Sequence, residues 1–486
     1  MGDPQPKGEQ PKAPLNTKPE RPQLPAEGGE IFRALSFDSP GMRLAANEHA
    51  AANDDSPNDD SKSDKDADGS ESKLKTGSAS VQPGAAPDSS VALVENTPVS
   101  KDWAQKVVVI GGGSYGTAIA HRLAQGGEDV MLWDRRSDTA RGINRERRNP
   151  HYLKDVLLSE TLRATESLSK GLEDRGVIIV AIPSHALQER LPQIKPHPQS
   201  LVISLTKGLI VEGWDPKGDP VLVAKGPPVG SRVLTPLQYM RTLEGWKDVE
   251  GLAVAAGPGF AKNIVNGCRF GITVASHSDE ARLQAYYVLA GKGLLVETSN
   301  DPVAVEVAAA MKNVIAVAAG VVQGLKRPDG TDMYGTEEIE LLKAQGMKET
   351  ARIVRHLGGH FRNLNLFSGW ADLNLTTKDG SSRNNQVGRD IAAGLSIVDI
   401  LGQRDRTAEG VYAAWAVKRM TDPVFETDGS MVRSGLYTPL TNALIDIIQK
   451  RATPHRIIDV FFEKNGTLKK ESIDADPFGA QYFPLD

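Results

Sequence analysis

Short apolar runs alternate with helical patterns from about residue 103 to residue 300. The runs KVVVI, EDVMLWD, GVIIVAIP, SLVISLT, GLAVAAG and GITVAS are rich in β-branched or small apolar residues, as buried parallel strands are. The stretches between them have apolar residues at helical spacing, and the first of these ends at Gly126 and Gly127. This alternation predicts an α/β domain over residues 102–300, built on a doubly wound parallel sheet.

Helical periodicity replaces the strand pattern after residue 300. A long apolar stretch rich in Ala and Val comes first, and an amphipathic stretch that stops at two glycines follows it. The helical patterns cover residues 301–325, 337–359, 382–402 and 407–422. Almost no strand signal occurs here, so residues 301–465 are predicted to form an all-helical C-terminal domain, with a C-terminal tail over 466–486.

The first hundred residues show neither pattern. Residues 1–30 are rich in Pro, Lys and Glu, and NDDSPNDDSKSDKDADGSESK is an acidic, serine-rich tract. Neither can bury enough apolar surface to offset its chain entropy, so residues 1–101 are predicted to be a disordered, low-complexity tail. The more apolar segment IFRALSFDSPGMRLA is either a short docking element or, as we favour, part of a solvated tail.

Composition and charge narrow the classes of protein to consider. The net charge is −5 with both signs mixed, so no basic surface indicates nucleic-acid binding. Cys268 is the single cysteine, which rules out an intrachain disulfide and fits a reducing compartment. No apolar run reaches the ~20 residues of a membrane span, and the acid-rich N-terminus lacks the apolar core of a secretory signal. We expect a cytoplasmic protein without a metal, and leave open organelle import through the tail.

Three glycines, Gly111, Gly113 and Gly116, lie between the first strand and the first helix. The second strand ends in Asp134 roughly 20 residues later, which completes the fingerprint of a dinucleotide-binding, Rossmann-type domain. Gly111 permits the tight turn, Gly113 lets the backbone approach a pyrophosphate, and Gly116 lets the helix lie close to the strand. The free N–H groups at the helix N-terminus then face the phosphates.

The residues after the second strand bear on the choice of nicotinamide cofactor. Asp134 is placed to accept hydrogen bonds from a ribose 2′-OH, which favours NAD. Arg135 and Arg136 follow at once and either meet the 2′-phosphate of NADP or are solvated loop charges. The sequence therefore favours NAD, with NADP tolerated.

Six motifs occur in the order in which a known family carries them: GGGSYGTA, SLTKGL, AAGPGFA, MKNVIAVAAG, ADLNLTT and SSRNNQVG. With these motifs, spread over roughly residues 105–450, the sequence resembles the NAD(P)-dependent glycerol-3-phosphate dehydrogenases. The resemblance implies an enzyme that interconverts dihydroxyacetone phosphate and sn-glycerol 3-phosphate with NAD or NADP. It also implies that the enzyme is a homodimer and that its product supplies glycerophospholipid synthesis.

Lys312 lies inside an otherwise apolar helix pattern, where desolvation can lower its pKa and suit it to general acid/base catalysis. A snorkelling surface lysine is the alternative, but the resemblance places the catalytic lysine here. Arg383 has a guanidinium fork that can bind two phosphate oxygens, and Ser382 and Asn384 flank it and can open the following helix.

The resemblance implies the remaining roles. The catalytic residues are Lys312, Asp372 and Lys207. The substrate-binding residues are Lys207, Gly257, Lys312, Asn313, Asp372, Thr376, Ser382, Arg383 and Asn384. The cofactor-binding residues are Gly111, Gly113, Ser114, Tyr115, Gly116, Asp134, Arg135, Pro183, Lys207, Ala261, Arg383 and Glu409.

The chain departs from the family pattern in three places. Gly259 stands where the family usually has Thr or Ser, so one hydroxyl contact worth about 0.5–1.5 kcal/mol is missing. Residues 213–251 and 325–338 form segments that are longer or more polar than usual. Neither segment removes a named catalytic residue.

Two other functions share parts of this pattern. A hydroxyacid or 6-phosphogluconate-type dehydrogenase has the same two-domain layout, but the SSRNN and TKGL motifs argue against it. A non-catalytic dinucleotide-binding sensor is opposed by the presence of all the catalytic and phosphate-binding residues, namely Lys207, Lys312, Asp372 and Arg383.

Overall fold

The computed structural model describes residues 106–461, apart from 216–218, 379, 381, 404–407, 426–430 and 433–434. The predicted tails over 1–101 and 466–486 lie outside the described residues.

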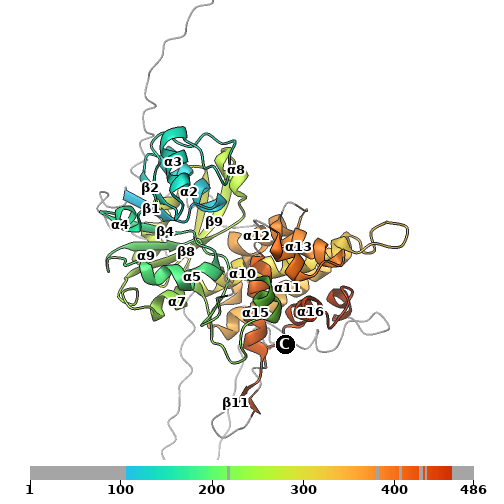
Figure 1. Ribbon diagram of the computed structural model, residues 1–486. Coiled ribbons are helices and arrows are strands. Elements are labelled where there is room, and N and C mark those ends of the chain that lie inside the picture. Colours follow the sequence, from blue (N-terminus) through green and yellow to red (C-terminus); the bar gives the residue numbers. More distant parts are fainter. Residues whose placement is uncertain are drawn as a thin grey trace, which may run out of the picture. The chain divides into compact units, whose positions relative to one another are not determined.

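The N-terminal part of the described chain is built on an eight-stranded sheet (Figure 1). Its strands are β1 (Lys106–Ile110), β2 (Asp129–Trp133), β3 (Arg163–Thr165), β4 (Val177–Val180), β5 (Leu201–Ser204), β8 (Gly251–Ala256), β9 (Phe270–Ala275) and β10 (Leu294–Ser299). The strand order is β10-β9-β8-β5-β4-β1-β2-β3. The predicted doubly wound sheet is confirmed, although β8 and β9 pair antiparallel while the other neighbours are parallel.

Both faces of the sheet are covered. Val107 and Val109 pack into one apolar cluster, whereas Val108 and Ile110 pack into another on the opposite face. Because both faces are buried, the strands are continuous apolar runs in the sequence, and these runs predicted six of the eight strands. It missed β3, which has only three residues, and β10, whose middle residues are partly exposed.

Helices connect the strands. They are α2 (Ser114–Gln125), α3 (Ser137–Glu146), α4 (Leu168–Leu172), α5 (Ser184–Arg190), η3 (Leu191–Gln193), α6 (Pro220–Lys225), α7 (Pro236–Thr242), α8 (Ala261–Val265) and α9 (Asp279–Leu289). The first extra segment, 213–251, contributes α6 and α7 and is joined by the two-stranded pair β6 (Ile210–Val211) and β7 (Val233–Leu234). The Trp415 indole donates to the Val223 carbonyl at 2.8 Å, which ties this segment to the C-terminal helices.

The C-terminal part is helical and is arranged around α10 (Figure 1). Its elements are α10 (Pro302–Gly324), α11 (Thr336–His356), η4 (Phe361–Asn365), the π-helical turn η5 (Phe367–Ala371), α12 (Asp372–Thr377), α13 (Arg383–Ala392), α14 (Ile397–Gly402), α15 (Glu409–Thr421), α16 (Pro439–Ile448) and α17 (Arg456–Asp459). The expectation of an all-helical domain is wrong at one point, because β11 (Val424–Phe425) pairs with β12 (Met431–Val432). Strands of two residues show no period that a sequence pattern could reveal.

The central helix α10 is long and apolar enough to cross a membrane by length and composition, which the expectation of no such run overlooked. Its most apolar window is nevertheless completely buried within the protein, as in the core helix of a globular domain. Helix α13 packs closely along it, because Gly388 and Gly320 have no side chain between the two backbones. This packing brings the start of α13 towards the helix that carries Lys312.

Candidate active site

The turn between β1 and α2 has a geometry that requires glycine. Gly111 has a φ of +120°, and a Cβ there would lie 2.6 Å from the Ala181 carbonyl oxygen. A Cβ on Gly116 would collide with the Gly111 carbonyl, so the helix lies against the strand end. A Cβ on Gly112 would lie 2.4 Å from Asp134 Oδ2, so this position also requires glycine. Gly112 was not singled out from the sequence, although its place between Gly111 and Gly113 could have indicated it.

The space in front of this turn can accept an anionic ligand. A Cβ on Gly113 would meet nothing within 4 Å, and the N-terminus of α2 has no side-chain cap. The first N–H groups of a helix have no intrahelical partner, and a phosphate is well suited to them. The residues present therefore fit the pyrophosphate of a dinucleotide, with Ser114 and Tyr115 supplying the first helical N–H groups.

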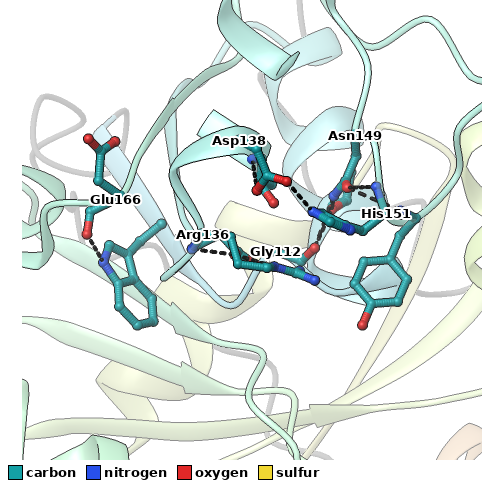
Figure 2. A network of polar contacts seen from close by, with 11 residues as sticks. Gly112, Arg136, Asp138, Asn149, His151 and Glu166 are labelled. Atoms are coloured by element: carbon teal, nitrogen blue, oxygen red, sulfur yellow. Dashed lines mark hydrogen bonds and ion pairs between the residues drawn. The ribbon is translucent and has the colours of Figure 1, made fainter. Parts of the chain in front are cut away.

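Asn149 ties the turn to the chain that follows α3 (Figure 2). Its buried amide nitrogen donates to the Gly112 carbonyl at 3.0 Å and to Thr117 Oγ1 at 2.9 Å. Its side-chain oxygen accepts from the backbone N–H groups of His151 and Tyr152. Sequence reasoning missed Asn149, because a lone Asn in a loop shows no pattern.

Asp134 and Arg136 form a close pair at the end of β2. Asp134 Oδ1 accepts from Arg136 N and Nε, both at 2.9 Å, and Oδ2 accepts from Nη2 at 3.1 Å. This hydrogen bonding raises the pKa of Arg136, whose guanidinium carbon lies 5.2 Å from the centre of the Tyr152 ring. Arg135, which the sequence analysis chose, is exposed instead.

Asp372 bridges two lysines that are far apart in the sequence. Lys312 Nζ on α10 lies 2.5 Å from Asp372 Oδ1 and 3.1 Å from Thr376 Oγ1. Lys207 Nζ, just after β5, lies 3.2 Å from Asp372 Oδ2 and 3.4 Å from the Gly257 carbonyl. The structure thus brings together five of the residues predicted for the substrate site.

The two lysines differ in their electrostatic state. Burial lowers the pKa of Lys312 to about 7, and the nearby Lys207 adds to this effect while Asp372 opposes it. Burial also acts to lower the pKa of Lys207, but Asp372 and Tyr115 outweigh it, so that pKa is raised. Lys207 therefore stays charged, whereas Lys312 is suited to exchange a proton near neutral pH.

Ser382 caps α13, as expected, by accepting from the Asn385 N–H. Arg383 is the first residue of this helix and is exposed, and Asn384 Oδ1 accepts from Gly410 N at 3.0 Å. Asn313 is buried on α10, next to Lys312. Ser382, Arg383 and Asn384 thus lie at the N-terminus of a helix whose backbone packs on α10.

Glu409, at the start of α15, contacts the beginning of α5. Ser184 Oγ donates to Glu409 Oε2 at 2.7 Å, and His185 Nδ1 lies 3.6 Å from Oε1. Pro183 precedes these two residues, so Glu409 lies close to the carboxyl end of β4, where parallel sheets bind ligands. Sequence reasoning missed Ser184 and His185, although both directly follow the apolar run GVIIVAIP.

The surroundings of Gly259 leave little room for a side chain. A Cβ there would lie 3.0 Å from the Phe270 ring and 3.2 Å from Ile264 Cδ1. Two apolar side chains therefore crowd the position at which the resemblance led us to expect Thr or Ser. Ala261, two residues further on, is the first residue of α8.

The chain was compared with known proteins. Family models for the N-terminus and the C-terminus of NAD-dependent glycerol-3-phosphate dehydrogenase match residues 106–282 and 301–459. The glycerol-3-phosphate dehydrogenase [NAD(P)+] of Acinetobacter baumannii (strain SDF) is 32% identical over 376 residues, which is 77% of this chain and 94% of the relative. The Myxococcus xanthus protein of the same name is 33% identical over 63% of this chain and 84% of its own. The crystal structure of glycerol-3-phosphate dehydrogenase from Coxiella burnetii superposes with a TM-score of 0.59 at 25% identity, covering 73% of this chain and 98% of that one.

Proposed function

Because the chain belongs to the NAD-dependent glycerol-3-phosphate dehydrogenase family, we propose that it interconverts dihydroxyacetone phosphate and sn-glycerol 3-phosphate with NAD or NADP. The observation that carries this proposal is the pair of lysines, Lys312 and Lys207, held by one buried carboxylate, Asp372. Ketone reduction needs a proton donor and fixed positive charge at the oxygen that gains electrons, and this cluster offers both.

The glycine turn and the N-terminus of α2 would hold the dinucleotide. Gly111, Gly113 and Gly116 shape the turn, and the N–H groups of Ser114 and Tyr115 would meet the pyrophosphate. Pro183, Ala261, Lys207, Arg383 and Glu409 complete the proposed cofactor site. When bound, the nicotinamide supplies or accepts the hydride.

Lys312 is proposed to give a proton to the C2 oxygen during reduction and to take it back during oxidation. Its pKa of about 7 lets both protonation states exist near neutral pH. Asp372 orients the ammonium group through the 2.5 Å contact, and Thr376 supports it from the next turn of α12. Lys207 keeps a positive charge beside the same carboxylate.

Arg383 is proposed to bind the substrate phosphate at the N-terminus of α13. Its planar guanidinium can pair with two phosphate oxygens, and the positive end of the α13 helix dipole adds to the attraction. Ser382, Asn384 and Asn313 lie on the same two packed helices, and the Gly257 backbone is proposed to complete the site. Together these groups would fix C2 relative to Lys312.

Cofactor choice depends on the pair at the end of β2. A free Asp134 would repel a 2′-phosphate, but both of its oxygens accept hydrogen bonds from Arg136. The pair therefore presents no uncompensated negative charge to the ribose, and the exposed Arg135 adds a positive one. This supports the use of both NAD and NADP.

The rate of NADH oxidation at 340 nm with dihydroxyacetone phosphate tests the proposal. Turnover is expected with this ketone, and little with dihydroxyacetone, which lacks the phosphate. Oxidation of 6-phosphogluconate in the reverse assay would identify the competing dehydrogenase class, and no turnover with any of these substrates would contradict the proposal.

We also propose that the enzyme is a cytoplasmic homodimer and that its product supplies glycerophospholipid synthesis. It is supported by the family resemblance and, for a reducing compartment, by the single cysteine. Light scattering of the purified full chain and microscopy of the tagged protein test the two statements separately.

A further inference from the structure

The hydroxyl of Tyr115 is a buried polar group without a partner. Tyr115 is the second residue of α2, next to the glycine turn. Its Oη is buried and makes no hydrogen bond with any residue that the structure describes. Buried side-chain polar atoms are hydrogen-bonded in the large majority of cases, so an exception beside a catalytic cluster needs an explanation.

The Tyr115 ring lies against the lysine cluster. Lys207 Nζ is 5.3 Å from the ring centre, close enough for a cation–π interaction. The same Nζ lies 3.2 Å from Asp372 Oδ2, and both charged groups act electrostatically on the phenol. The hydroxyl therefore belongs to the same small region as the lysines and Asp372, although it comes from the nucleotide-binding turn.

The Tyr115 hydroxyl can act as a hydrogen-bond donor at any pH at which the enzyme works. Burial raises the pKa of the phenol, so it keeps its proton, and Lys207 opposes this only in part. A neutral O–H next to an ammonium group is suited to donate a hydrogen bond to an oxygen that gains negative charge during a reaction.

We propose that Tyr115 Oη donates a hydrogen bond to the C2 oxygen of the three-carbon substrate, an inference that rests on the function proposed above. In the reduction, a hydride adds to C2 and the π electron pair of the carbonyl moves onto its oxygen. Lys312 transfers a proton to that oxygen, while Tyr115 keeps its own proton and stabilises the developing charge. Bound substrate thus satisfies the hydroxyl that has no partner in the described structure.

The variant Tyr115→Phe tests the proposal, because it removes the hydroxyl and keeps the ring under Lys207. Tyr287→Phe, the same change at an exposed position on α9, is the matched control. Calorimetry of the full chain gives the Kd of NADH, and then the Kd of sn-glycerol 3-phosphate in the presence of NADH, a complex that cannot turn over.

Tyr115→Phe should raise the Kd of sn-glycerol 3-phosphate about 3- to 10-fold, the range expected for one lost hydrogen bond. The Kd of NADH should stay within about twofold, and kcat/KM should fall by a similar factor for dihydroxyacetone phosphate and for dihydroxyacetone, because the contact is at C2. The melting temperature of the ligand-free protein should not fall, since the lost hydroxyl has no intramolecular partner.

Three results for Tyr115→Phe would overturn the inference: an unchanged Kd for sn-glycerol 3-phosphate, a raised Kd for NADH as the sole effect, or a lower melting temperature of the ligand-free protein. The second result would assign the hydroxyl to the cofactor, and the third to the fold. A wild-type chain that does not reduce dihydroxyacetone phosphate would instead refute the proposed function, so the two failures are distinguishable.

Discussion

Lys312 Nζ lies 2.5 Å from Asp372 Oδ1, and both side chains are almost fully buried. The pair joins the middle of α10 to the first residue of α12, so it both orients the lysine and links the two helices. Because Asp372 also binds Lys207, a single carboxylate faces two ammonium groups. Burial is the main reason why the pKa of Lys312 falls to about 7, and the charge of Lys207 adds to it while Asp372 opposes it.

The pH dependence of the two reaction directions should have opposite signs. Reduction needs protonated Lys312, so kcat should fall as pH rises through about 7, whereas oxidation needs the neutral amine and should rise through the same range. Asp372→Asn removes the charge that opposes the lowered pKa, so both transitions should move to lower pH. Rate profiles with wild type and variant check this, and a shift to higher pH would contradict the assignment.

Lys312→Ala should lower kcat about 10²- to 10⁴-fold, the usual contribution of general acid/base catalysis. The Kd of NADH should change little, because the glycine turn lies on other elements. Lys247→Ala, at an exposed position after α7, serves as the control and should keep wild-type rates. A Lys312 variant with more than about a tenth of the wild-type kcat would argue against this role.

Arg383→Lys should be severe although it conserves the charge, because an ammonium group cannot form the planar two-point contact with phosphate. We expect kcat/KM for dihydroxyacetone phosphate to fall roughly 10- to 100-fold. Dihydroxyacetone should be a poor substrate for both enzymes and little affected by the change. Arg451→Lys, on the exposed surface, is the matched control, and near-normal kinetics of Arg383→Lys would place the phosphate elsewhere, with Lys207 as the next candidate.

Cofactor preference should respond in opposite directions to the two members of the pair at the end of β2. Arg136→Ala leaves the Asp134 charge uncompensated, so the ratio of kcat/KM for NADPH to that for NADH should fall about tenfold. Asp134→Ala frees the Arg136 guanidinium and should raise the ratio. Steady-state kinetics with both cofactors measure this ratio. A larger effect of Arg135→Ala than of Arg136→Ala on the ratio would show that the exposed Arg135 binds the 2′-phosphate.

Glu306, on α10, should make stability depend on pH. Burial raises its pKa from 4.5 to about 8, while Oε1 accepts from the Leu237 N–H at the start of α7. Because the folded-state pKa is raised, the folded protein binds the proton more tightly than the unfolded chain does. The stabilisation is therefore complete below pH 4.5 and is lost as pH rises through about 8.

Denaturant unfolding at several pH values between 5 and 9 measures this loss. Glu306→Gln should flatten the profile, whereas Glu337→Gln, an exposed change on α11, should leave it as in wild type. Glu349, whose pKa burial raises to about 7, contributes with the same sign and keeps some slope in both variants. A Glu306→Gln profile as steep as that of wild type would contradict the prediction.

Local patterns were sufficient for the features that local physics controls. The apolar runs predicted six strands of the sheet, because strands buried on both faces must be apolar at every position. The glycine spacing predicted the turn, and Gly111 does have a positive φ that a side chain would strain. An isolated lysine in an apolar helix pattern drew attention to Lys312, and the family resemblance favoured a catalytic role over a snorkelling surface lysine.

The pairing of charged groups was decided by the tertiary structure alone. Asp372 reaches Lys312 across 60 residues and Lys207 across 165, and no spacing along the chain carries that information. The Asp134 partner is Arg136 and not Arg135, because neighbouring side chains point in different directions as the chain leaves the strand. The sequence by itself determined which chemical groups the chain offers and on which elements they lie. Only the packing of α10 against α12 and α13 decided which of them share a buried site, because burial and distance set their charges.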